Sequence, residues 1–318
     1  VGRLEAEVVD YFEAPQIEGA ALLRRGSRET AGIAYGELEE FEPDVVLNLS
    51  GLLRDDELRR RAKARVYMDL DPVFTQIWHA QGVDMGLEGH THHVTYGRDL
   101  GLRSVPLDRP WIEADPPVVL DRWPVAKQLE HAAFTTVGNW RSYGSVEWRG
   151  ATYGQRAHSV RRMLDLPAMT SERLLPAFAI HADETADLGA LDEHGWEVAD
   201  PAQVAGTPDT YRRFVAGSKG ELGLVKAGYV DSHSGWFSDR SACYLASGRP
   251  VVAQDTGFGE RLPVGEGLLA FASAAEAAEA IAGICADYER HRRAARQVAE
   301  ACFDSDAVLT KLLEAVSP

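Results

Sequence analysis

Cysteine is scarce in this chain, with three residues in 318, at Cys243, Cys285 and Cys302. An odd number without C-x-x-C spacing excludes a disulfide-built scaffold and argues against a cysteine-based metal site. The sequence therefore predicts reduced thiols and a cytoplasmic protein. It begins with Val1 rather than methionine, which leaves room for a segment that precedes it.

Long apolar runs are also absent. No stretch approaches the ~18–20 consecutive apolar residues that a membrane-spanning helix needs. Residues 1–7 include charged side chains and lack the apolar core of a signal peptide. We therefore expect no transmembrane segment.

Basic residues are few relative to acidic ones, with 33 Lys and Arg against 49 Asp and Glu and a net charge of -16. Such a charge repels a phosphate backbone and argues against non-specific nucleic-acid binding. A pocket for one small anion is still compatible with it, because a few backbone N–H groups and one or two cations suffice. With 45% hydrophobic and 26% charged residues, the composition is that of a globular protein. The length predicts two domains.

The first half of the chain contains apolar, β-branched runs at 43–51, 64–72 and 92–101, separated by segments of about helix length. This alternation is typical of βαβ units and a parallel sheet. Ligands collect at the carboxyl ends of such strands, which is where Asn48, Asp69, Asp71 and Tyr96 fall.

A stretch with five prolines, 106–124, follows these strands and is the best candidate for a linker. We therefore expect an N-terminal domain over 1–120 and a second α/β domain over 121–318. In the second domain the patterns predict strands at 134–140, 174–181, 196–200, 220–226, 249–257 and 267–271, and helices at 153–166, 187–195, 207–218, 238–248 and from 274 onward.

The segment Gly235–Phe271 carries the strongest chemical signal. Ser238 or Asp239 can cap a helix whose N–H groups and positive dipole end suit a phosphate, and Arg240 adds a cation. Alternatively, Arg240 pairs on the surface with an acid such as Asp239 or Glu260. The strand 249–257 then ends in Thr256 and Gly257, a turn that brings backbone close to a ligand.

The order of these features resembles the donor-binding end of group 1 glycosyltransferases with the GT-B fold. The matching residues are Ala246, Gly248, Pro250, Val251, Val252, Gly257, Gly267, Leu268 and Leu269. The resemblance covers residues 134–318, and the first half only through its strand pattern. It implies two Rossmann-like domains facing across a cleft, C-terminal helices that cross back, and a nucleotide-sugar donor in the second domain. It also implies transfer without a metal or other cofactor.

The chain departs from that family at two positions. Retaining members carry two glutamates eight positions apart, and the corresponding residues here are Gly235 and Cys243. Neither accepts hydrogen bonds from a sugar as a carboxylate does. Glu221, Asp239 or Glu260 must then take that role, or the donor is held differently, so the sequence leaves the stereochemistry open.

A second donor-side element is the loop at 137–145. The resemblance places Gly138, Asn139 and Arg141 next to the diphosphate, and arginine offers a planar fork of donors to phosphate oxygens. Lys226 is a further candidate cation, or a solvated lysine at a strand end. The aromatic residues that we expect to stack on a base or sugar, or to belong to the core, are Trp140, Trp148, Trp236 and Phe258.

Carboxylates and histidines of the first half are candidates for the acceptor side. Asp69 and Asp71 end a strand, and alternation points both to one side, where either serves as a general base for a hydroxyl. Alternatively, Asp71 only shapes the turn before a proline. His90 and His92 are expected on one strand face, as a base, a sugar contact, a buried structural residue or, with His93, part of a metal site.

These features predict transfer of a sugar from a nucleotide donor to a hydroxyl acceptor in the cleft between the two domains. Two alternatives remain at this point. A sugar epimerase or phosphorylase would use the same pocket, and a two-domain ligand-binding protein of periplasmic type would have the same architecture.

Overall fold

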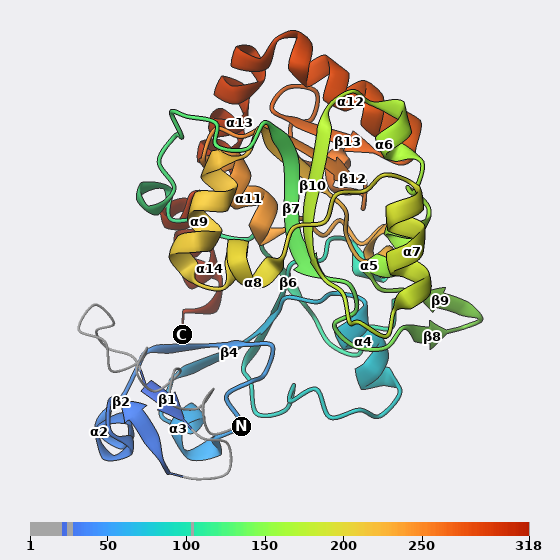
Figure 1. Cartoon of the computed structure of the whole chain (residues 1–318). Helices are drawn as coiled ribbons and strands as arrows, with labels where there is room; N and C mark the ends of the chain where they lie inside the picture. Colours follow the sequence, from blue (N-terminus) through green and yellow to red (C-terminus); the bar gives the residue numbers. More distant parts are fainter. Residues whose placement is uncertain (1–20, 24–27, 103–104, 318) are drawn as a thin grey trace. The chain divides into compact units, whose positions relative to one another are not determined.

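The computed structural model describes residues 21–23, 28–102 and 105–317 (Figure 1). The predicted N-terminal domain therefore falls partly outside the described residues. The chain divides into two compact units. Unit 1 takes its described residues from Val1–Leu70, Asp84–Val94 and Leu313–Pro318, and unit 2 from Asp71–Val83 and Thr95–Leu312. Residues 95–120 belong to unit 2, and the domain boundary expected at residue 120 stays a prediction.

Unit 1 contains a small parallel sheet. β3 (Val45–Leu49) pairs in parallel with β4 (Ala64–Asp69), and the helix α3 (Asp56–Arg60) connects the two strands. β5 (His92–Thr95) is next in the strand order. All three strands predicted from the first half are therefore present. The other elements of this unit are β1 (Ala21–Leu23), β2 (Thr30–Gly32) and α2 (Tyr35–Glu40).

Unit 2 is built on five parallel strands in the order β10-β7-β11-β12-β13. They are β7 (Ala133–Asn139), β10 (Arg173–Ala179), β11 (Gly220–Gly223), β12 (Val251–Gln254) and β13 (Leu268–Phe271). Numbered along the chain, the order is 2-1-3-4-5, that of a doubly wound sheet. The direction of winding reverses between β7 and β11, so this is the edge where a ligand is expected.

Helices cover both faces of this sheet (Figure 1). On one face α5 (Arg156–Arg161), α6 (Leu166–Met169), α7 (Thr185–Glu193) and α12 (Ala274–Ala286) form a core with β7 and β10. On the other, α9 (Pro208–Gly217), α11 (Asp239–Ala246) and α13 (Tyr288–Cys302) pack on β12 and β13. None of the helices in the described part of the chain is long and apolar enough to cross a bilayer.

The remaining elements are short, apart from the last helix. They are α4 (Phe74–Ala80), the 3-10 turns at Leu100–Leu102, Leu120–Arg122 and Phe258–Glu260, β6 (Ile112–Glu113), β8 (Val146–Trp148), β9 (Ala151–Tyr153), α8 (Pro201–Ala205), α10 (Ala227–Asp231) and α14 (Ser305–Val316). The three cysteines form no disulfide.

Two element predictions for the second half are wrong. The helix predicted over 153–166 begins only at Arg156, because β9 continues to Tyr153, and it ends at Arg161. The strand predicted at 196–200 is irregular. Its apolar pattern comes from Trp196, which fills the core and donates its indole N–H to Leu164 O at 2.9 Å.

Candidate functional site

The carboxyl ends of β7 and β11 adjoin where the winding of the unit 2 sheet reverses. Ligands of doubly wound sheets bind outside the strand ends at such a point. β7 ends in Gly138 and Asn139, two of the predicted donor-binding residues. At Gly138 a Cβ atom would lie 2.2 Å from Nη1 of Arg156. Glycine is therefore what leaves room for that guanidinium.

Arg156, the first residue of α5, joins the ends of both strands. Its Nε donates to Leu224 O (2.8 Å), just beyond β11, and its Nη1 donates to Asn139 O (2.5 Å), at the end of β7. The side chain is buried and has no carboxylate partner among the described residues. Burial lowers the pKa of Arg156 to about 9, and the positive charge of Arg240 acts in the same direction. A buried cation that forms no ion pair with a described carboxylate is a candidate anion-binding group at this edge.

Arg240 supplies a second buried cation under the same edge. Its Nε donates to Glu221 Oε1 (2.5 Å) and its Nη1 donates to Val137 O (3.0 Å). Glu221 is 0% exposed and Arg240 is 9% exposed. Burial opposes the charge, but the ion pair with Glu221 raises the pKa of Arg240. Nη2 of Arg240 is buried and has no hydrogen-bond partner in the described part of the chain.

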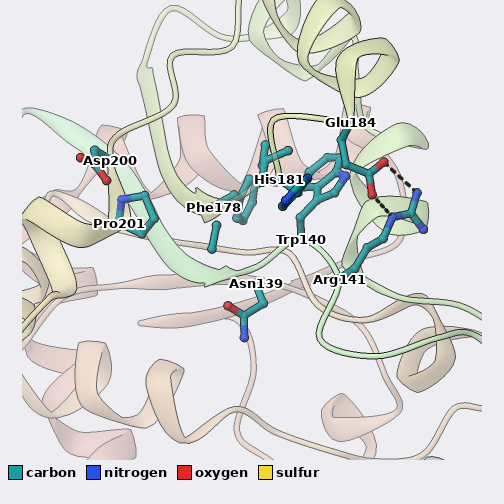
Figure 2. A pocket seen from close by; sticks show the side chains of 10 residues that line it. Asn139, Trp140, Arg141, Phe178, His181, Glu184, Asp200 and Pro201 are labelled. Carbon is teal, nitrogen blue, oxygen red and sulfur yellow. Dashed lines mark hydrogen bonds and ion pairs between the residues drawn. The ribbon is translucent and has the colours of Figure 1, made fainter. Parts of the chain in front are cut away.

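A pocket of about 540 Å³ opens at the carboxyl ends of β7 and β10 (Figure 2). It is lined by Asn139, Trp140, Arg141, Phe178, Ala179, Ile180, His181, Glu184, Asp200 and Pro201. Figure 2 shows Arg141 and Glu184 on one side and Asp200 and Pro201 on the other. Arg141, the predicted phosphate contact, forms an ion pair with Glu184 through Nε, and its Nη2 lies 3.3 Å from Glu184 Oε2. An anion must therefore compete with Glu184 for this arginine.

Lys226 follows β11 and belongs to a cluster with Asp71. Its Nζ forms an ion pair with Asp71 Oδ1 and donates to the Tyr143 hydroxyl at 2.5 Å. The hydroxyls of Tyr143 (2.8 Å) and Tyr229 donate to the same carboxylate oxygen. Burial by itself raises the pKa of Asp71, but Lys226 and these donors outweigh it, so the pKa is lowered. A carboxylate stabilised in this way is a weak base and a firm anchor for Lys226.

The turn after β12 is pinned to the segment that precedes α11. Gly257 has φ +94°, and a Cβ there would lie 3.0 Å from the His233 ring. The Thr256 hydroxyl donates to Trp236 O (2.5 Å), and Thr256 O accepts from the Gly235 amide (2.6 Å). These contacts give the predicted donor turn a fixed shape.

Four other predicted donor residues lie near that turn or under it. Ser238 is the N-cap of α11, and Asp239 is exposed in its first turn, so the helix begins where the sequence predicts. Glu221 and Phe258 are enclosed by protein, with 0% and 2% exposure. Fully buried side chains do not contact a ligand. Glu221 and Phe258 therefore support the residues around the site and do not make the predicted direct contact. The partner of Arg240 is Glu221, which corrects the surface pairing with Asp239 or Glu260.

The two predicted carboxylate bases do not share a strand face. β4 ends at Asp69, which is buried in unit 1, so strand alternation does not extend to Asp71. The two residues belong to different units. Among the residues described, no group of three or more His, Cys, Asp or Glu side chains is arranged to hold a metal ion.

His90 lies before β5 in unit 1 and uses both ring nitrogens. Nδ1 is 3.1 Å from Leu87 O, and Nε2 is 3.0 Å from Nδ2 of Asn48. Burial lowers the pKa of His90, and the charge of Arg59 contributes. His93 also contacts Leu87 O, at 3.1 Å, so His90 lies with His93 rather than sharing the expected face with His92.

Sequence reasoning missed Arg156 and the far wall of the pocket. A cation in the first turn of a helix opposes the helix dipole, so local stability does not explain it, and this signal applies to Arg156 as it does to Arg240. It was hidden because the helix was predicted to start at residue 153. His181, Glu184 and Asp200 had no local signal, since only the ends of two strands bring them together.

The sequence matches no protein-family model and no curated protein. Solved structures with a similar fold include Anabaena HepE in complex with UDP and glucose, with a TM-score of 0.57 at 14% identity over 89% of this chain and 79% of that one. An alpha-glucosyltransferase in complex with UDP and a 13-mer DNA has a TM-score of 0.56 at 12% identity over 89% and 83%. AviGT4, a glycosyltransferase involved in Avilamycin A biosynthesis, has 0.52 at 13% over 87% and 74%. The chain therefore has the fold of glycosyltransferases, and the predicted GT-B fold is confirmed.

Proposed function

We propose that this chain is a glycosyltransferase that moves a hexose from a nucleotide-sugar donor to a hydroxyl acceptor. The observation that carries the proposal is the pocket of about 540 Å³ at the carboxyl ends of β7 and β10, beside two buried arginines. The fold is shared with proteins whose structures hold UDP, which supports a similar donor here.

The nucleoside of the donor is proposed to occupy the pocket. Its volume falls in the ~300–1,000 Å³ range of sites for small organic ligands. Trp140 and Phe178 lie beneath the pocket as part of the core, and the Trp140 ring is fixed because its N–H donates to Asp187 at 2.7 Å. Asn139 and Asp200 offer hydrogen bonds to a base or to ribose hydroxyls.

The diphosphate is proposed to lie over the ends of β7 and β11. The nearest cations there are Arg156, which forms no ion pair with a carboxylate among the described residues, and Arg240, which lies beneath the strand ends. A charge-assisted hydrogen bond contributes ~1.5–3 kcal/mol. Such fixed charges stabilise a departing nucleoside diphosphate without reorganisation. Because two arginines supply this charge, we propose that transfer needs no metal and no further cofactor.

Lys226, Arg141 and the turn at Gly257 complete the proposed donor site. Asp71 is proposed to hold Lys226 toward the strand ends through its ion pair. The predicted bases Asp71, Asp69 and His90 stay proposals for activation of the acceptor hydroxyl, and both carboxylates have a feature that opposes the role: Asp69 is buried, and the pKa of Asp71 is lowered. Of these, Asp71 belongs to the same unit as the pocket.

The test is a transfer assay with UDP-, GDP- and ADP-hexoses and a panel of methyl glycosides. We expect one donor to yield nucleoside diphosphate and glycosylated product in equal amounts. Arg156→Met should abolish turnover, whereas Arg122→Met, at an exposed 3-10 turn, should not. If the donor sugar is altered without an acceptor, the chain is an epimerase or phosphorylase instead. Loss of turnover in EDTA, restored by manganese, would overturn the metal-free scheme.

A further inference from the structure

A second cavity of unit 2, of about 250 Å³, has no part in the proposed donor site. It lies where the chain leaves β5, and its polar lining comes from Thr95, Asp99, Arg109 and Glu113. Trp111 and leucine side chains provide the apolar part. We propose that this cavity, the acceptor pocket, binds a single neutral sugar ring and presents its hydroxyl to Asp99. The acceptor role rests on the proposed transferase function.

The charges around the acceptor pocket select against an anion. Glu113 is paired with Arg98, whose Nη1 lies 3.2 Å from Glu113 Oε2. Arg109 is held by Asp108, through Nε at 2.9 Å and Nη2 at 2.8 Å. The carboxylate of Asp99 makes no ion pair or side-chain hydrogen bond within the described residues. One negative charge is therefore left over, which accepts hydrogen bonds from hydroxyls and repels phosphates and carboxylates.

Asp99 is also fixed in position. Its backbone lies in the left-handed region, with φ +49°, which aspartate tolerates better than most residues. Its amide donates to Glu113 Oε1 at 2.7 Å. Glu113 is itself held by Arg98, so these contacts fix the backbone that carries the Asp99 carboxylate.

Size and lining point to a sugar ring. The volume is below the ~300–1,000 Å³ of typical sites for larger organic ligands, so one ring fits better than a chain of rings. Trp111 offers a flat apolar face, and sugars present both C–H faces and hydroxyls. A flat indole beside an unpaired carboxylate suits this combination.

A small cavity of about 60 Å³ adjoins this pocket and also borders the donor turn. Asp99 and Glu113 line both cavities, and the other walls of the small one are Arg98, Gly235, Gly257, Glu260 and Arg261. Asp99 therefore lies between the acceptor pocket and the turn proposed to hold the donor. An acceptor hydroxyl bound to Asp99 would face that turn.

The experiment is a binding titration, which needs no turnover. Saturation-transfer NMR would be recorded with methyl glycosides of glucose, galactose, mannose and N-acetylglucosamine, with and without saturating UDP, and with glucose 6-phosphate as the anionic comparison. We expect at least one neutral glycoside to bind and the phosphate not to. Asp99→Asn, which keeps the backbone preference, and Trp111→Ala should each weaken binding tenfold or more. Asp121→Asn, at an exposed 3-10 turn, should leave it unchanged.

UDP binding is measured on the same samples and separates this inference from the proposed function. If UDP binds but no neutral glycoside does, the acceptor pocket is wrong and the donor site stands. If glycosides bind and none of UDP, GDP and ADP does, the sugar site stands and its acceptor role falls. Preference for glucose 6-phosphate over methyl glucoside, or glycoside binding that Asp99→Asn leaves intact, would also overturn the inference.

Discussion

Replacement of Arg240 by alanine should destabilise the protein strongly, because it leaves a buried carboxylate without its cation. Glu221 has no exposed surface, and its Oε1 accepts from Arg240 at 2.5 Å. Its Oε2 has no hydrogen-bond partner among the described residues. Removal of one partner from a buried ion pair costs about 3–5 kcal/mol. Arg240→Ala should therefore lower the free energy of unfolding by about that amount.

The double variant Glu221→Gln, Arg240→Met should be far less affected. A neutral pair of similar volume leaves no uncompensated charge, so it avoids the penalty of about 3–5 kcal/mol for a buried charge without a partner. Urea denaturation of the wild type, Glu221→Gln, Arg240→Met and the double variant gives the coupling energy, with Arg240→Ala measured beside them. If Arg240→Ala costs under ~1 kcal/mol, as for an exposed pair, the buried pair is wrong. We expect the double variant to stay folded and to bind UDP at least tenfold more weakly.

Three further outcomes follow from the same structure. Gly138→Ala should push the Arg156 guanidinium away and weaken UDP binding, measured by calorimetry, tenfold or more, which is ~1.4 kcal/mol. Gly144→Ala, where nothing lies within 4 Å of the new methyl group, should leave UDP binding unchanged, and an equal loss in both variants would contradict the placement of the diphosphate. Asp71→Asn should weaken donor affinity as well as turnover if Asp71 anchors Lys226; a fall in kcat of ~10²–10⁴ with unchanged affinity would make it the general base. Burial lowers the pKa of His90, so below the ordinary pKa of ~6.5 the unfolded chain binds more protons than the folded one. The free energy of unfolding should therefore fall as pH drops through that value, and in denaturation between pH 5 and 7.5 it should depend less on pH for His90→Gln than for the wild type.

The sequence predicts the strands of this fold well because of how they are buried. A strand covered on both faces reads as a continuous apolar run, as at Val251 and Val252, and turn residues mark where it stops. The same reading fails at Trp196, where the apolar residues belong to an irregular segment whose indole fills the core. Periodicity does not distinguish these cases, since both bury apolar side chains.

The candidate site is less predictable because distant segments assemble it. Arg240 and Glu221 are 19 residues apart, on a helix and a strand, and neither carries a local sign of the other. Arg156 reaches Leu224 across 68 residues. Turn chemistry identified Gly257, where φ is +94°, but the pocket wall at Asp200 depends on the course of a loop.

A structure determined with the tightest binder among UDP, GDP and ADP tests the central claim most directly. We predict that the base lies between Asn139 and Pro201, in the pocket at the ends of β7 and β10, with the phosphates over the strand ends that contact Arg156 and Arg240. A nucleotide bound elsewhere, or none bound at saturating concentration, would contradict it.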